Sequence, residues 1–248
     1  MQLSFIKNGT DKRSIFDKKM WNYAIRGSIS DSNFIYLNKP KCACTTIKRV
    51  LRNAESVYSN NKLSSYSKNV HDVENSPFAH SISHIQTMPD DSFIFTFVRN
   101  PYIRIFSCYR DKCIITSDKQ KILKPLKELG VGHRFISFQE FLEFIAAQPV
   151  EKRDPHWQLM SKLQIPHLLE CDFIGSVENF GADMMYVLRC VYPNLNDINL
   201  NFLGAHNLNS RAYKAKIEDQ ISLKNIQLIK ELYMEDFKYP ESVKPKTF

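Results

Sequence analysis

Several features that would assign a class at once are missing from this sequence. No apolar run reaches the roughly 18 residues that a membrane-spanning helix needs, so we expect no membrane span. The N-terminal residues show no apolar stretch followed by a small-residue cleavage site, so we expect no secretory signal and a cytoplasmic location. Glycine is scarce, at 7 residues, and no stretch matches the glycine-rich Walker loop of many nucleotide-binding enzymes.

The six cysteines do not form a pattern that predicts zinc binding or disulfides. No pair has CxxC spacing, and Cys42 and Cys44, with one residue between them, would chelate a metal poorly. A chain of 248 residues can bury enough apolar surface to fold without disulfide staples. We therefore expect free thiols that pack as small apolar side chains, and no metal site.

Composition and charge indicate a soluble globular domain with anionic partners. Hydrophobic residues make up 43% and charged residues 24% of the chain, which is ordinary for such a domain. We expect one domain over residues 1–248, with a core over about 34–240 and a lead-in over 1–33. The net charge of +8 fits nucleic acids, anionic glycans and phosphorylated cofactors equally well.

Short apolar strands alternate with helical patterns along the chain. The predicted strands are Phe34–Leu37, Phe93–Val98 and Cys171–Val177, and residues with helical periodicity follow each of them. Further helices are expected over Phe135–Ala147 and over residues 217–237. This alternation predicts an α/β layered fold with a parallel sheet, in which ligands bind outside the carboxyl ends of the strands.

The first predicted strand runs into a loop suited to an anion. Residues 39–46 supply Lys39 and Lys41, small side chains and the hydroxyls of Thr45 and Thr46 before a helix begins. Backbone N–H groups and the helix dipole favour negative charge at such a helix start, and a lysine adds a full positive charge. The loop holds no glycine and is not a Walker loop, but it predicts a phosphate cradle.

A second charged loop follows the strand Phe93–Val98. Arg99 stands at the strand end, and Pro101 suits the first turn of a helix. Ser107 lies a little over two helical turns beyond Arg99, which places it on the side facing the strand end. Either residue alone is ordinary in a salt bridge or in helix packing, whereas an arginine fork together with a hydroxyl can clamp a phosphate.

Taken in order, these stretches resemble the carbohydrate sulfotransferases that depend on 3′-phosphoadenosine 5′-phosphosulfate (PAPS), known as sulfotransferase family 2, and among them the chondroitin and heparan 2-O types. KPKCACTTIKR (39–49) is similar to their 5′-phosphosulfate loop, and FVRNPYIRIFSCYR (97–110) is similar to their 3′-phosphate motif. The stretches DPHW (154–157) and DFIG to EN (172–179) add to the likeness, as does the tail near Tyr213 and Asp236. The likeness covers roughly residues 34–240.

The resemblance implies a P-loop-NTPase-like three-layer fold with a central parallel sheet. It also implies an enzyme of EC 2.8.2 type, which moves the sulfuryl group of PAPS to a hydroxyl of a carbohydrate by in-line displacement. Such transfer is catalysed mostly by positioning and electrostatics, so no metal is required. Lys41 would contact the 5′-phosphate and the leaving oxygen. The other donor contacts that the resemblance implies are Ala43, Cys44, Thr45, Thr46, Arg99, Ser107 and Arg211.

The acceptor hydroxyl needs a general base near neutral pH, and histidine is the natural choice. His80 lies upstream of the strand Phe93–Val98, much as the heparan 2-O enzymes place their base, and is our first choice. His84 is the second. We expect His156 and Trp157 in the acceptor site, where the Trp157 ring could stack on a sugar.

Where the sequence departs from the family, the expectations change. Golgi members from mammals carry an N-terminal anchor and lumenal disulfides, and neither is evident here, so we expect a cytoplasmic enzyme of bacterial type in polysaccharide biosynthesis. Thr46 stands where relatives often have asparagine or serine. The acceptor would be a polysaccharide, an oligosaccharide or a glycolipid, and no nucleic-acid partner is expected.

Two other functions stay open at this point. One is a nucleotide or sugar kinase that binds ATP on Lys41–Thr46, although a Walker loop and an acidic metal ligand at a strand end are not evident. The other is a basic protein that binds nucleic acid or polysaccharide and retains a degenerate donor site.

Overall fold

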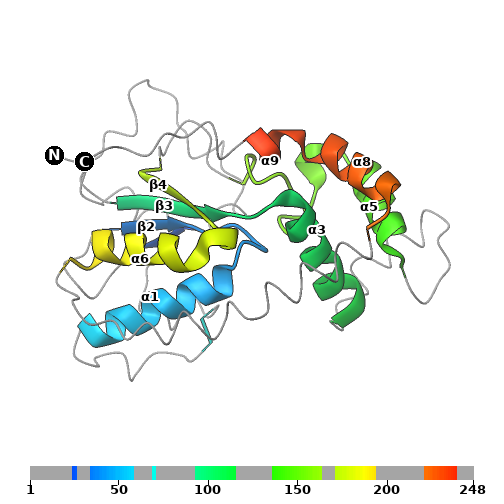
Figure 1. Ribbon diagram of the computed structural model, residues 1–248. Helices are drawn as coiled ribbons and strands as arrows, with labels where there is room; N and C mark the ends of the chain where they lie inside the picture. The colour runs from blue at the N-terminus through cyan, green and yellow to red at the C-terminus, as the bar shows by residue number, and fades with distance from the viewer. Residues whose placement is uncertain are drawn as a thin grey trace, which may run out of the picture.

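A four-stranded sheet lies at the centre of the computed structural model, which describes residues 24–26, 34–58, 69–70, 93–115, 136–163, 171–193 and 221–238 (Figure 1). The strands lie side by side in chain order: β1 (Ala24–Arg26), β2 (Phe34–Leu37), β3 (Phe93–Val98) and β4 (Phe173–Ser176). β2, β3 and β4 are parallel, and β1 is antiparallel to β2. The structure therefore has the mixed α/β character and the parallel strands that the sequence predicts.

β3 lies between the two other parallel strands, β2 and β4, and its sequence FIFTFV suits this buried place. All six residues are buried, as expected of a parallel strand covered on both faces. Thr96 is its single polar residue, and its hydroxyl donates to the carbonyl of Leu37 at 2.6 Å. The register places Leu37 opposite Thr96, and Val98 opposite Ser176, so the three parallel strands end along one edge.

Two helices cover one face of the sheet: α1 (Cys44–Tyr58) and α6 (Phe180–Val191) lie side by side (Figure 1). Their apolar faces form a core with the aromatic rows of the strands, which include Phe34, Phe95 and Phe97. The Tyr192 hydroxyl donates to the buried Glu55 carboxylate at 2.7 Å and joins the two helices.

A second group of helices lies beyond the carboxyl ends of the strands (Figure 1). Its members are α3 (Pro101–Tyr109), which continues as a π-helical turn (Arg110–Ile115), α5 (Phe138–Ala146), α8 (Leu223–Leu232) and α9 (Met234–Lys238). They share a separate apolar core that includes Ile105, Phe141 and Ile229. None of the helices among the described residues has the length and apolar character needed to cross a membrane.

The structure moves several boundaries that the sequence predicts, and β4 covers Phe173–Ser176 where Cys171–Val177 was expected. α5 begins at Phe138, because Ser137 and Glu140 form a capping box there. The helix expected over 217–237 breaks at Tyr233, whose φ of −125° ends α8 before α9 begins. The structure also contains β1, a strand too short for its pattern to be seen in the sequence.

Gly175 in β4 packs closely against the Phe97 ring of β3. A Cβ atom added there would lie 2.6 Å from Cε1 of Phe97, whose buried ring is held by Phe95 and Phe180. We expect Gly175→Ala to lower the free energy of unfolding by about 1–3 kcal/mol, measured by chemical denaturation. The control Ala182→Ser, at an exposed position of α6, should change it by no more than about 0.5 kcal/mol. Equal stability of the two variants would contradict the close contact.

Candidate anion-binding site

The loop between β2 and α1 has an unusual backbone for a sequence without glycine. Lys41 has a φ of 67° and Ala43 a φ of 58°, both in the left-handed region that glycine favours. Each such residue costs on the order of 1 kcal/mol, and strain of this kind is often found at functional sites. The Ala43 carbonyl accepts from Ile47 N at 3.0 Å, so Ala43 starts α1 without a capping side chain. The start of α1 therefore keeps the polarity that attracts an anion.

Hydrogen bonds join the ends of the three parallel strands. Arg99, which follows β3, donates from Nη1 to the Lys41 carbonyl at 3.2 Å. Asn100 N donates to Glu178 Oε1 at 3.0 Å, and Glu178 follows β4. The two charged loops that the sequence singles out are thus brought together at the carboxyl edge of the sheet, and Arg99 reaches the main chain of the Lys41 loop directly.

One face of α3 and of its π-helical extension contacts the loop between β2 and α1. Arg104 Nε donates to the Pro40 carbonyl at 3.2 Å, and Asp111 Oδ2 accepts from Lys41 Nζ at 3.0 Å. Ser107 lies three residues after Arg104 and four before Asp111, so it shares this face and is half-buried. The side chains of Lys41, Arg99 and Ser107 therefore come from three different elements around one loop.

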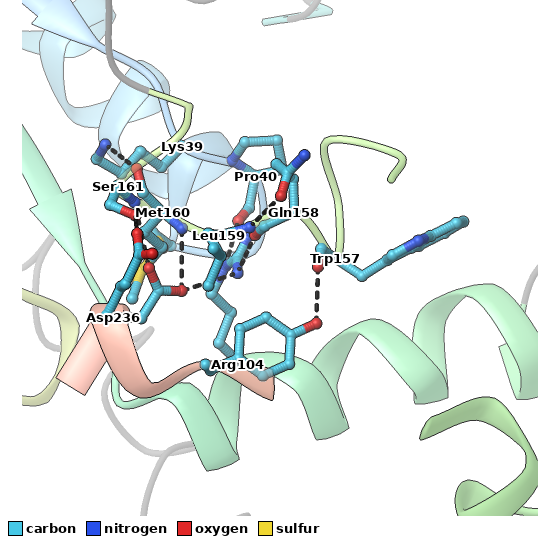
Figure 2. A network of polar contacts seen from close by, with 12 residues as sticks. Lys39, Pro40, Arg104, Trp157, Gln158, Leu159, Met160, Ser161 and Asp236 are labelled. Atoms are coloured by element: carbon cyan, nitrogen blue, oxygen red, sulfur yellow. Dashed lines mark hydrogen bonds and ion pairs between the residues drawn. The ribbon is translucent and has the colours of Figure 1, made fainter. Parts of the chain in front are cut away.

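A network of buried charges joins the loop after β2 to other segments (Figure 2). The Arg104 guanidinium is 1% exposed and also donates to the Gln158 carbonyl at 2.8 Å. Its Nη1 lies 3.8 Å from Asp236 Oδ2, and the Asp236 carboxylate accepts from the backbone N–H groups of Met160 and Ser161. The residues of this network lie in four segments: the loop after β2, α3, the turns at 154–161 and α9.

Lys39 belongs to this buried network, whereas the Lys41 side chain is partly exposed. It is 1% exposed, and its Nζ donates to the Met160 carbonyl at 2.8 Å. Sequence reasoning did not foresee that Lys39, Arg104 and Asp236 would support the loop. The one signal for Arg104 was its place in the 3′-phosphate motif, which would have suggested a phosphate contact instead.

The turn that holds His156 has the geometry of a histidine oriented by a carboxylate. His156 Nδ1 lies 2.7 Å from Asp154 Oδ1, which also accepts from His156 N at 2.9 Å. Burial acts to raise the pKa of Asp154, but the hydrogen bonds from His156 outweigh it, so the pKa lies below its ordinary value. A neutral His156 that donates from Nδ1 carries its lone pair on Nε2, where it can accept a proton.

Trp157 does not have the role that the sequence suggested. Its side chain is 7% exposed and packs edge-on against Phe141 and Phe144, with ring centroids 5.9 and 6.1 Å away. Its indole N–H donates to Gln148 Oε1 at 2.9 Å. The ring is part of the second core, and this corrects the expectation that it stacks on a sugar.

The remaining predicted site residues divide into two groups. Ala43, Cys44, Thr45 and Thr46 lie where expected, at the start of α1, and all are partly exposed. His80, His84 and Arg211 lie outside the described residues, as does Tyr213, and their roles stay predictions. All six cysteines are free thiols, as expected.

These features define a class of protein, an α/β protein with cationic side chains gathered at the carboxyl edge of its parallel strands. A family model described as "Sulfotransferase family" matches residues 29–239. The chain belongs to this family.

Comparison with individual proteins points in the same direction. The chain is 27% identical over 177 residues to carbohydrate sulfotransferase 14 of Danio rerio, a match that covers 65% of this chain and 46% of the relative. It is 28% identical over 179 residues to carbohydrate sulfotransferase 11 of Danio rerio, covering 65% and 51%. With carbohydrate sulfotransferase 12 of Mus musculus the identity is 25% over 207 residues, covering 68% and 49%. The chain thus matches about half the length of these curated relatives, and no solved structure matches it significantly.

The buried Lys39 gives stability a characteristic pH dependence. Burial lowers the pKa of Lys39 from 10.5 to about 8, and the folded state therefore binds fewer protons than the unfolded state between these values. The contribution of Lys39 to stability should rise with pH over this window. We expect the wild type to gain stability relative to Lys39→Met between about pH 8 and pH 10, measured by denaturation at each pH. Lys230→Met, at an exposed position of α8, is the control, and a flat difference for both variants would refute the prediction.

Proposed function

We propose that this chain is a PAPS-dependent carbohydrate O-sulfotransferase. The observation that carries the proposal is the contact between Arg99 Nη1 and the Lys41 carbonyl, 3.2 Å apart, which joins two cationic loops at the start of α1. Two neighbouring cations and a helix start suit a ligand with two separate phosphate groups, which is the character of PAPS. Membership of the sulfotransferase family supports the same assignment.

The proposed reaction assigns one task to each group. The acceptor hydroxyl oxygen attacks the sulfur, the bond from sulfur to the 5′-phosphate oxygen breaks, and the hydroxyl proton passes to a histidine. Lys41 and the first turn of α1 offset the charge that develops on the leaving phosphate, while Arg99, Ser107 and Arg211 hold the 3′-phosphate. The proposal assigns no task to a metal ion.

The acceptor is proposed to be a carbohydrate, because the matched relatives are named as carbohydrate sulfotransferases. The exposed side of His156, oriented by Asp154, is the described feature that suits the acceptor side. The strand, loop and helix over residues 34–58, beside two further parallel strands, support a P-loop-like three-layer fold as part of the proposal. The cytoplasmic location expected from the sequence stays a prediction.

Calorimetric titration with PAP, the product of PAPS, beside 5′-AMP and ATP, tests the donor site. We expect PAP to bind most tightly, because only PAP carries both a 5′- and a 3′-phosphate. Lys41→Ala and Arg99→Ala should each weaken PAP binding by about tenfold or more, since each removes a charge-assisted hydrogen bond. Arg189→Ala, at an exposed position of α6, is the matched control and should leave the affinity unchanged. A preference for ATP would favour a kinase, and no binding at all would favour a basic binding protein.

His80→Ala separates catalysis from donor binding. We expect this variant to bind PAP like the wild type and to lose about 10²–10⁴-fold in the transfer of radiolabelled sulfate from PAPS to a panel of glycans, which is the usual effect of removing a general base. His84→Ala and His156→Ala are measured beside it. Full turnover in His80→Ala with loss in either of the other variants would reassign the base, and the Asp154 contact makes His156 the structural alternative.

A further inference from the structure

Basic side chains converge on the loop between β2 and α1. Lys39 is buried beneath it, Lys41 lies in it, and Arg99 and Arg104 each donate to one of its carbonyls. Among the described residues, two carboxylates form ion pairs with these cations: Asp236 with Arg104, and Asp111 with Lys41. These two carboxylates offset part of the positive charge around the loop.

The two carboxylates differ in how easily they could give up their partners. Asp236 is 1% exposed and is bound by two backbone N–H groups besides Arg104, so its place is fixed by the fold. The Asp111 side chain is 35% exposed and that of Lys41 is 16% exposed. An ion pair in contact with water is weak, on the order of 1 kcal/mol or less, and a ligand can exchange with it.

The π-helical turn places Asp111 at this point. α3 ends at Tyr109, and the wider turn Arg110–Ile115 carries Asp111 to Lys41, 70 residues away in the chain. Turns of this type occur often at functional sites. Lys112 Nζ lies 3.9 Å from the same carboxylate oxygen, so Asp111 does not depend on Lys41 alone for its neutralisation.

We propose that Asp111 is a positioning residue that holds the Lys41 ammonium group when the donor is absent and releases it to the 5′-phosphosulfate when the donor binds. The inference rests on the proposed function, because it takes Lys41 as the donor contact. The Asp111 carboxylate keeps the ammonium group beside the loop between β2 and α1, and Lys112 stays near Asp111 after the exchange. Donor binding must then break one exposed ion pair, and the affinity measured for the donor includes that loss.

Asp111→Asn keeps the shape of the side chain and removes its charge. We expect this variant to bind PAP about three- to tenfold more tightly than the wild type in calorimetry, because no ion pair has to break and no carboxylate repels the anion. Glu143→Gln is the matched control: it makes the same chemical change at an exposed ion pair of α5 with Lys224 and should leave the affinity unchanged. Asp111→Ser repeats the test with a different neutral side chain, and thermal melting of each variant checks that it is folded.

A second measurement reads the state of Lys41 without any ligand. Competitive labelling with an amine-reactive reagent, followed by mass spectrometry, gives the reactivity of Lys41 relative to exposed Lys230. We expect the relative reactivity of Lys41 to rise by about threefold or more in Asp111→Asn, because an ammonium group held by a carboxylate is less available.

The outcomes separate the two proposals. PAP binding by the wild type with unchanged or weaker binding by Asp111→Asn would overturn the role of Asp111 and leave the proposed function intact. The role of Asp111 is overturned in the same way if Glu143→Gln tightens binding equally, or if Lys41 reactivity stays the same in Asp111→Asn. Absence of PAP binding by the wild type would overturn the proposed function, and the role of Asp111 with it.

Discussion

The contacts of the buried Arg104 guanidinium hold the loop between β2 and α1 in place. A charge taken out of water loses several kcal/mol of solvation unless it is paired and hydrogen-bonded. Here the carbonyls of Pro40 and Gln158 accept from it, and the Asp236 carboxylate lies 3.8 Å away. One side chain thus fixes the loop after β2, the turns at 154–161 and α9 relative to α3. Left-handed residues such as Lys41 and Ala43 persist only where the surroundings hold them so firmly.

Buried charges and partly exposed charges have different places at this edge of the sheet. The register of β2, β3 and β4 brings three strand ends together, so the loops that follow them meet without any long excursion. Charges beneath the loop, such as Lys39 and Asp236, are buried and bound to the main chain, which makes them part of the scaffold. The Lys41 and Asp111 side chains keep contact with water, and the role that we propose for Asp111 requires that this pair can open. Sulfuryl transfer relies on positioning and electrostatics. Buried charges that fix the loop, together with exposed charges beside it, suit the function that we propose.

Local sequence pattern predicted the parts of the fold whose signals are themselves local. β2 is a continuous apolar run, and β3 is apolar except for Thr96. Pro101 with Asn100 marks the start of α3, where the Asn100 side chain accepts from Tyr102 N. The sequence did not predict β1, because three residues are too few to show a period. It did not predict the break at Tyr233 either, because the residues around Tyr233 are compatible with a longer helix. Trp157 shows a different kind of failure. An aromatic residue beside a histidine looks the same in sequence whether its ring meets a sugar or, as here, Phe141.

The sequence by itself determined the alternation of the parallel strands with helices, the residue types of the two cationic loops, and hence the family. These depend on residues within a few positions of one another. Tertiary structure decided which cation does what: Lys39 is buried on the Met160 carbonyl, Lys41 faces Asp111, and Arg104 supports the main chain. The partners in these contacts lie between 64 and 121 residues apart in the chain. A local pattern shows that a lysine is charged, but the atoms that neutralise it are chosen by the packing of distant segments, and only the folded chain brings those atoms within reach.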